Sequence, residues 1–142
     1  MRIRSGIHDY ELHIEHSFAF AQALAEAEQT YYVADANVYR LYPALFERIP
    51  GERLSVLNAV EENKTLETAL GICERMTALN ARRNARLVSF GGGITQDVTG
   101  FAANVLYRGV HWTFVPTTLL AACDSCIGGK TSLNYLGYKN LL

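Results

Sequence analysis

A short strand-like run that ends in three consecutive glycines constrains the fold of this chain more than any other feature. Residues 86–90, Arg-Leu-Val-Ser-Phe, include the β-branched and aromatic residues typical of a strand, and they lead directly into the glycine triplet at 91–93. A helix is expected to follow over about residues 95–107. A strand, a glycine turn and a helix in this order are typical of a βαβ unit, which favours a parallel sheet.

The rest of the chain repeats this alternation of strands and helices. Period-2 patterning or β-branched and aromatic content predicts strands at residues 10–15, 30–34, 54–57 and 112–115. Helices are expected at residues 18–28, at 37–48 with a break at Pro43, and at 64–83. The last of these carries an apolar stripe formed by Leu66, Ala69, Leu70, Cys73 and Met76. The sequence therefore predicts one α/β, Rossmann-like domain over residues 1–142 with a mostly parallel sheet.

Composition narrows the classes of partner. The chain is 49% hydrophobic with a formal net charge of -1, which gives no bulk positive charge for nucleic acid or an anionic membrane surface. It has no apolar run of the roughly 18 residues that a membrane span needs, and no secretory signal, so we expect a cytoplasmic protein. Because residues 139–142 end without a helix cap or a polar tail, we expect the chain to be a fragment of a longer protein.

The glycine triplet is the first candidate site. Glycines let backbone N–H groups approach a pyrophosphate, and the next helix points the positive end of its dipole at the same place. The spacing from Gly91 to Asp97 is not that of the G-x-G-x-x-G fingerprint, so a plain tight turn remains an alternative.

A second glycine-rich segment, Asp124 to Thr131, is similar to the end of a P-loop. Asp124 stands where a P-loop requires glycine, and its carboxylate would repel a cradled phosphate. A loop that carries this carboxylate close to the Lys130 ammonium suits a hydroxylated, phosphorylated metabolite instead. Cys123 and Cys126 are interpreted as small structural residues, and neither they nor the four histidines are assigned to a metal site.

Taken together, these segments resemble 3-dehydroquinate synthase and the related sugar phosphate cyclases. The matching pieces extend over about fifty residues, in an order more specific than any single motif. They are the glycine triplet with Asp97, residues 100–103, 107–109 and 115–120, Asp124-Ser125, residues 128–131, Asn134 and Lys139-Asn140. Weaker matches lie upstream, at Asp35-x-Asn37, residues 50–52 and Glu61-x-x-Lys64.

The resemblance implies a tightly bound NAD. The residues that it places on the cofactor are Asp35, Asn37, Glu61, Lys64, Gly91, Gly92, Gly93, Asp97, Thr117 and Thr118. An acid at the end of an early strand, as at Asp35, also favours NAD over NADP, because it would repel the 2′-phosphate. Thr117 and Thr118 can equally serve only as turn residues at a strand end.

The resemblance also implies a substrate and a reaction. It places Asp124, Lys130, Lys139 and Asn140 around a seven-carbon sugar acid phosphate, with Arg108 reaching a phosphate, in one arrangement across a homodimer interface. The reaction is the cyclisation of 3-deoxy-arabino-heptulosonate 7-phosphate to 3-dehydroquinate with loss of phosphate, a step of the shikimate pathway. A divalent metal, zinc or cobalt, is expected to be held by a C-terminal helical domain absent from this chain, so the fragment alone is expected to be inactive.

Three other interpretations stay open. Cys126 stands where dehydroquinate synthases usually have serine, and Thr95-Gln96 where residues are smaller or more apolar, which leaves room for a cyclase of another sugar phosphate. Iron-type alcohol and glycerol dehydrogenases share the glycine triplet and the Pro-Thr-Thr segment, but lack the Lys130 and Lys139 pair. The third is an NAD-binding or dimerisation module without activity, against which the intact Asp124, Lys130 and Asn140 argue.

Overall fold

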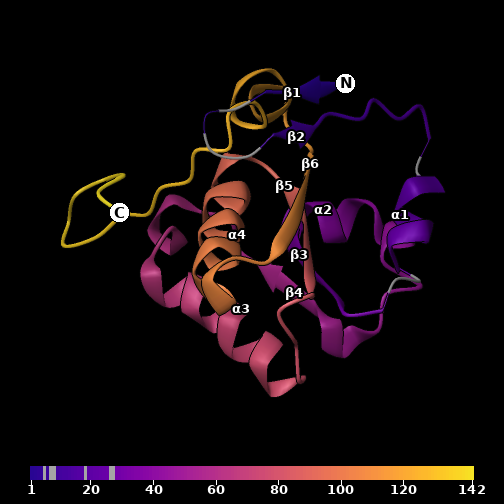
Figure 1. Ribbon diagram of the computed structural model, residues 1–142, viewed down its shortest axis with the longest axis horizontal. Coiled ribbons are helices and arrows are strands. Elements are labelled where there is room, and N and C mark those ends of the chain that lie inside the picture. Colours follow the sequence, from indigo (N-terminus) through magenta and orange to yellow (C-terminus); the bar gives the residue numbers. More distant parts are fainter. Residues whose placement is uncertain (5, 7–8, 18, 26–27) are drawn as a thin grey trace.

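The computed structural model describes residues 1–4, 6, 9–17, 19–25 and 28–142, and it shows an α/β domain built on a four-stranded parallel sheet. The strands are β3 (Thr30–Asp35), β4 (Leu54–Leu57), β5 (Arg86–Gly91) and β6 (His111–Pro116). They lie in the order β4-β3-β5-β6, and every neighbouring pair is parallel (Figure 1). The fold class predicted from the sequence is confirmed.

The connections leave the centre of this sheet in two directions. The chain runs from β3 to the edge strand β4, crosses back to β5 on the other side of β3, and continues outward to β6. The segments that follow the neighbouring strands β3 and β5 therefore lead to opposite sides of the sheet, toward β4 and β6. Open α/β sheets bind ligands in the crevice at the carboxyl ends of such strands.

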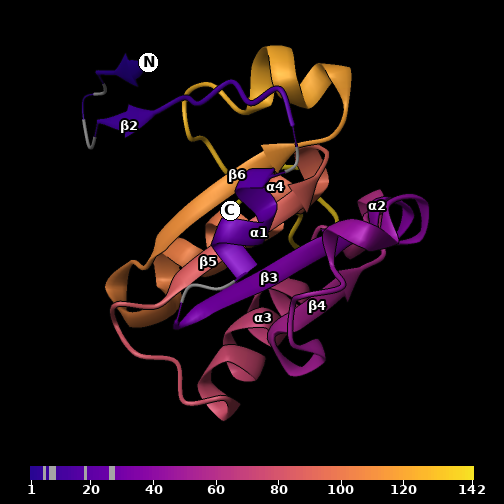
Figure 2. The same ribbon diagram turned by 90° about the vertical axis from the view of Figure 1, so that its right-hand side faces the viewer.

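Helices cover both faces of the sheet. Helices α3 (Leu66–Ala78) and α4 (Gly93–Val105) lie on one face, and α1 (Ala19–Ala25) and α2 (Ala36–Leu41) on the other (Figures 1 and 2). Successive residues of β3 point to opposite faces, so Tyr31 packs with α3 and α4 while Tyr32 packs with α1 and α2. Both faces of the sheet are thus buried, as parallel sheets require.

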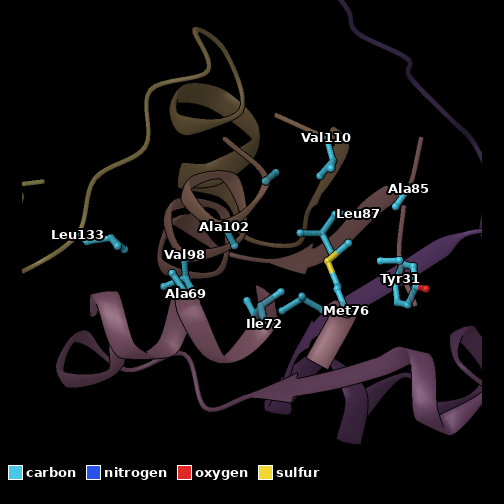
Figure 3. Close-up of a cluster of buried hydrophobic side chains, with 13 residues drawn as sticks. Tyr31, Ala69, Ile72, Met76, Ala85, Leu87, Val98, Ala102, Val110 and Leu133 are labelled. Carbon is cyan, nitrogen blue, oxygen red and sulfur yellow. The ribbon is translucent and has the colours of Figure 1, made fainter. Parts of the chain in front are cut away.

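The larger core lies between the sheet and α3 and α4. Met76 of α3 and Leu87 of β5 meet in its centre, with Val98 and Ala102 of α4 on the same side (Figure 3). Leu133, from the segment that follows β6, is fully buried in this cluster. Its burial anchors the last part of the chain against the helices.

Two helices begin where side-chain caps favour them. The Asp35 carboxylate accepts a hydrogen bond of 2.7 Å from the Asn37 N–H and caps α2, as predicted. Thr65 caps α3 by accepting from the Thr68 N–H. Short helical turns occur at Pro43–Leu45, Gly51–Arg53, Glu61–Asn63 and Leu106–Arg108, and one π-helical turn at Ala121–Ser125.

One predicted strand is wrong over most of its length. The alternation at residues 10–15 forms only β2 (Tyr10–Glu11), which pairs antiparallel with β1 (Arg2–Ile3). A strand needs a hydrogen-bonding partner, and β1 is only two residues long. Ile14, expected on a buried face, is 78% exposed.

Other differences are smaller. Leu70 was expected in the apolar stripe of α3 but is exposed, and Ile72 is buried instead, because the buried face is centred on Ala69 and Met76. Helix α4 begins at Gly93, directly after the glycine turn, rather than near Thr95. Of the helix predicted at 18–28, residues 19–25 form α1, Glu28 lies in a turn, and residues 18 and 26–27 lie outside the described residues. Within the ranges described above, none of the helices combines the length and apolarity needed to cross a membrane.

Candidate functional site

The glycine triplet forms the turn between β5 and α4. A Cβ at Gly91 would lie 2.3 Å from Thr95 Oγ1, so a side chain there would force the first turn of α4 away from the strand. Gly92 is the N-cap residue of α4 and places no side chain over the helix end. The first N–H groups of the helix lack intrahelical acceptors and carry the positive end of its dipole. The turn is thus open to an anion.

Asp35 lies at the carboxyl end of β3, next to the glycine turn. The two strands are paired up to Ala34 and Phe90, so the residues that follow each of these emerge side by side. One oxygen of the Asp35 carboxylate caps α2, and the second is not used by that bond. Asn37 is exposed in the first turn of α2. A carboxylate and an anion-binding turn therefore share the crevice between β3 and β5.

A buried ion pair stands beside this crevice. Lys64 is only 7% exposed, and its Nζ lies 2.5 Å from Asp97 Oδ2 on α4. The same ammonium donates a hydrogen bond of 2.6 Å to Asn140 Oδ1. Burial of the ammonium is compensated by the carboxylate and the amide oxygen. The structure thus brings together two residues predicted for the cofactor and one predicted for the substrate.

Glu61 lies one helical turn before Lys64 and joins the same cluster. Its carboxylate accepts a hydrogen bond of 2.9 Å from Asn134 Nδ2. That hydrogen bond is the main cause that lowers the pKa of Glu61, and the positive charges of Lys139 and Lys64 add to it. Glu61 is therefore a firmly ionised acid beside Lys64.

Thr117 and Thr118 follow β6 and border the glycine turn. The Thr117 N–H donates to the Gly91 carbonyl at 2.8 Å, which ties the end of β6 to the turn. The Thr118 hydroxyl accepts from the Ala121 N–H at 3.2 Å, so it caps the π-helical turn Ala121–Ser125. A Cβ at Gly92 would lie 3.2 Å from the Thr118 methyl group. Thr118 thus has a turn role in the structure, and both residues line the candidate site.

Asp124 and Lys130 belong to the segment after this turn. Asp124 is exposed in the π-helical turn, and Lys130 is exposed after Gly128 and Gly129, which adopt φ values of +107° and +64°. The Gly128 N–H donates to the Tyr10 hydroxyl at 2.8 Å, so the amino-terminal hairpin supports this loop. Among the described residues, no side-chain hydrogen bond or ion pair joins Asp124 or Lys130 to the Lys64 cluster. The structure places them on the same edge of the sheet without direct contact.

Arg108 lies at the other end of α4. Three consecutive residues there, Tyr107, Arg108 and Gly109, have positive φ values of 52°, 65° and 113°. Since α4 has 13 residues and rises about 1.5 Å per residue, Arg108 lies about 20 Å from the glycine turn. The structure does not bring Arg108 into the site of its own chain.

Two side chains in the site carry roles that sequence reasoning missed. Asn134 is one of the positions that match the family and has no predicted role, yet it contacts Glu61 and Asn140. Gln96 departs from the family pattern, and the structure buries it, with Nε2 donating to the Ser125 carbonyl. The position of Asn134 directly after the buried Leu133 was the available signal, because a polar side chain beside a core residue needs a partner.

No metal site is formed by the part of the chain that the structure describes. It contains no group of three or more His, Cys, Asp or Glu side chains that could hold an ion. His13 is paired with Glu11 at 2.9 Å, and His8 lies outside the described residues. Both cysteines of the C-x-x-C spacing are free thiols, and burial raises the pKa of Cys126, which is the opposite of an activated nucleophile.

The family profile described as 3-dehydroquinate synthase N-terminal matches residues 54–142, more than half of the chain. The chain belongs to this family. A 3-dehydroquinate synthase of Clostridium tetani is 38% identical over 117 residues, which cover 80% of this chain and 31% of that protein. One from Streptococcus pyogenes serotype M3 is 32% identical over 100% of this chain and 42% of its own length. The chain thus spans about a third to two fifths of the curated relatives that it matches.

Solved structures of other cyclases share the fold of this family member. The 2-epi-5-epi-valiolone synthase of Streptomyces hygroscopicus subsp. jinggangensis 5008, with NAD+ and Zn2+ bound, has a TM-score of 0.74 and 32% identity, over 87% of this chain and 36% of its own. A 2-deoxy-scyllo-inosose synthase complexed with carbaglucose-6-phosphate, NAD+ and Co2+ has a TM-score of 0.72 and 33% identity, over 90% and 38%. The resemblance inferred from the sequence is therefore confirmed at the level of the family.

Proposed function

We propose that this chain binds NAD and supplies one side of the substrate site of a 3-dehydroquinate synthase, within a longer cytoplasmic protein. The observation that carries the proposal is the crevice between β3 and β5. There Asp35 and the Gly91–Gly93 turn follow neighbouring parallel strands, at the point where the strand order of the sheet reverses. The buried Lys64–Asp97 pair lies beside them. An anion-binding helix end next to a carboxylate fits a dinucleotide that carries a pyrophosphate and free ribose hydroxyls.

The residues divide into those that hold NAD and those that hold the substrate. The open oxygen of Asp35 accepts ribose hydroxyls, the amides of the glycine turn bind the pyrophosphate, and Thr117 borders it. The cluster of Glu61, Lys64 and Asp97 supplies further charged and polar contacts to the cofactor. Bound NAD supplies reversible hydride transfer at a substrate hydroxyl.

The substrate is a seven-carbon sugar acid phosphate, 3-deoxy-arabino-heptulosonate 7-phosphate. Asp124 and Asn140 bind its hydroxyls, while Lys130 and Lys139 neutralise its carboxylate and the phosphate that leaves. Both lysines are exposed, so such a ligand has access to them. The product is 3-dehydroquinate, which places the reaction in the shikimate pathway.

A divalent metal, zinc or cobalt, is implied by the family but does not fit the residues present. The described residues of this chain offer no cluster that could hold it. We assign its ligands to a C-terminal domain beyond this chain, and we derive no step through it. The chain by itself is expected to bind NAD without completing the reaction.

Arg108 supports a homodimer. It lies about 20 Å along α4 from the glycine turn, too far to reach a phosphate bound there. An arginine presented on an exposed corner can serve the site of a second copy, where its guanidinium forks onto phosphate. A two-fold dimer of the complete protein would give each site one such arginine.

A related cyclase of another sugar phosphate is the second candidate. The valiolone and inosose synthases whose solved structures contain NAD+ are 32% and 33% identical to this chain, a similarity in the range of the curated dehydroquinate synthases. Gln96 also fills space between α4 and the turn that carries Asp124. Because this packing differs from the usual family pattern and lies next to a proposed substrate residue, it favours a substrate other than that of dehydroquinate synthase.

The product of the complete reading frame tests the cofactor first. Calorimetric titration should show NAD binding more tightly than NADP, and Asp35→Asn should reduce this preference while keeping the cap of α2, since Asn caps helices as well as Asp. Equal binding of both nucleotides by the unaltered protein contradicts the assignment of Asp35.

Phosphate release then tests the substrate. With NAD and zinc or cobalt, 3-deoxy-arabino-heptulosonate 7-phosphate should release phosphate, and Lys130→Ala should abolish the release. Tight NAD binding without phosphate release would contradict the dehydroquinate synthase assignment and favour a sister cyclase or a dehydrogenase.

A further inference from the structure

One carboxamide links the two sides of the candidate site. Asn134 Nδ2 donates to Glu61 Oε1 at 2.9 Å and to the Glu61 carbonyl at 3.2 Å. Asn134 Oδ1 accepts from the Asn140 N–H at 2.9 Å. The backbone N–H of Asn134 donates to the Lys64 carbonyl at 2.8 Å. The donor and acceptor ends of this side chain are both engaged, one on the proposed cofactor side and one on the proposed substrate side.

The two partners of Asn134 lie in short loop segments, where regular secondary structure does little to fix them. Glu61 lies in a single 3₁₀ turn before α3, and Asn140 adopts a positive φ of 56° in an exposed segment. Asn140 Oδ1 accepts hydrogen bonds from Lys64 Nζ at 2.6 Å and from the Ser132 hydroxyl at 2.9 Å, while Asn134 holds the Asn140 backbone. Side chains on loops keep a fixed geometry only when other groups hold them.

We propose that Asn134 is a positioning residue that fixes Glu61 for the cofactor and Asn140 for the substrate through one amide group. The inference rests on the proposed function, because it takes Glu61 as a cofactor-side acid. Asn134 is half-buried next to the fully buried Leu133, and both ends of its amide group are engaged by two site residues, so we infer that it acts through them and not on a ligand. The substrate class is the sugar acid phosphate already named.

A double-mutant cycle on NAD affinity tests this inference in the product of the complete reading frame. Asn134→Ala should weaken NAD binding about tenfold, the loss expected when a hydrogen bond to a charged group disappears. In a Glu61→Ala background the same change should have less than a twofold effect, because a residue that acts through Glu61 has nothing left to position. Asn104→Ala, on the exposed end of α4, serves as the matched control.

A pH series separates positioning from a loss of folding. Asn134→Asp keeps an acceptor for the Asn140 N–H but places a second carboxyl group against Glu61. Two adjacent carboxyl groups share a proton at low pH, and the protonated one can again donate. The affinity deficit of Asn134→Asp relative to the unaltered protein should therefore be several-fold smaller at pH 5 than at pH 8. A merely destabilised protein would show the same deficit at both values.

The outcomes distinguish the two proposals. No NAD binding by the unaltered protein overturns the proposed function and this inference with it. Normal binding by the unaltered protein together with unchanged affinity in Asn134→Ala, or an equal loss in the Glu61→Ala background, overturns only the role of Asn134. An Asn134 effect that vanishes without Glu61, with the reduced deficit at pH 5, supports it.

Discussion

Replacement of Lys64 by methionine tests the buried ion pair. The Lys64 side chain is 9% exposed, the Asp97 side chain is 19% exposed, and their charged atoms lie 2.5 Å apart. Lys64→Met keeps the unbranched apolar part of the side chain but removes the ammonium group, which leaves the carboxylate without its cation. Removing one partner of a buried pair costs about 3–5 kcal/mol. Because about a fifth of the Asp97 side chain reaches water, we expect a loss of about 2–3 kcal/mol in the free energy of unfolding.

Equilibrium urea denaturation of this chain measures that loss. Lys139→Met is the matched control: the same substitution at an exposed lysine should change the free energy of unfolding by no more than about 0.5 kcal/mol. The double variant Lys64→Met/Asp97→Asn should be more stable than the sum of its single variants predicts, by about 1 kcal/mol or more. Additive effects of the two single variants, or a Lys64→Met effect as small as that of the control, would refute the reasoning.

Three further predictions concern single residues. Because the pKa of Glu61 is lowered in the folded state, its carboxylate adds stability at pH 7 that is lost as the pH falls below about 4.5, so Glu61→Gln should flatten this acid loss in urea titrations. Gly100→Ala places a Cβ 2.4 Å from a threonine methyl group and 2.9 Å from a tryptophan ring, so it should lower the free energy of unfolding in urea by about 1–3 kcal/mol. Gly71→Ala has open space on α3 and should raise the same free energy by about 0.5–1 kcal/mol. Arg108→Gly relieves a positive φ of 65° and should raise the melting temperature of the complete protein while it lowers phosphate release; unchanged turnover would exclude Arg108 from the site.

The parallel sheet could be predicted from the sequence because its strands are buried on both faces. The strand predicted at residues 54–57 has those bounds in the structure, and the strand at 86–90 differs only by the addition of Gly91. The predicted strand at 10–15 failed because alternation reports a half-buried face but not the presence of a partner. The prediction that Leu70 is buried was wrong for a similar reason, since an apolar stripe at helical spacing does not specify which of its residues face the sheet.

The candidate site could be predicted residue by residue but not contact by contact. Asp35 and the glycine turn follow strands, so the parallel order of the sheet alone places them at one edge. The contacts of Lys64 with Asp97 and Asn140 join residues 33 and 76 positions apart in the sequence. The hydrophobic periodicity of a sequence describes single helices and strands, so it cannot predict contacts between residues so far apart.

The sequence by itself determined the alternation of strands and helices, the glycine turn and the identity of the family, because each depends on neighbouring residues or on ordered short motifs. Only the tertiary structure decided that residues proposed for the cofactor and residues proposed for the substrate share one cluster. Burial of Leu133 against α3 and α4 brings the last segment back over Lys64. Because a buried ammonium group without partners is costly, Lys64 pairs with the polar groups that this packing places next to it. Asp97, Asn140 and, through Asn134, Glu61 are brought together by that packing.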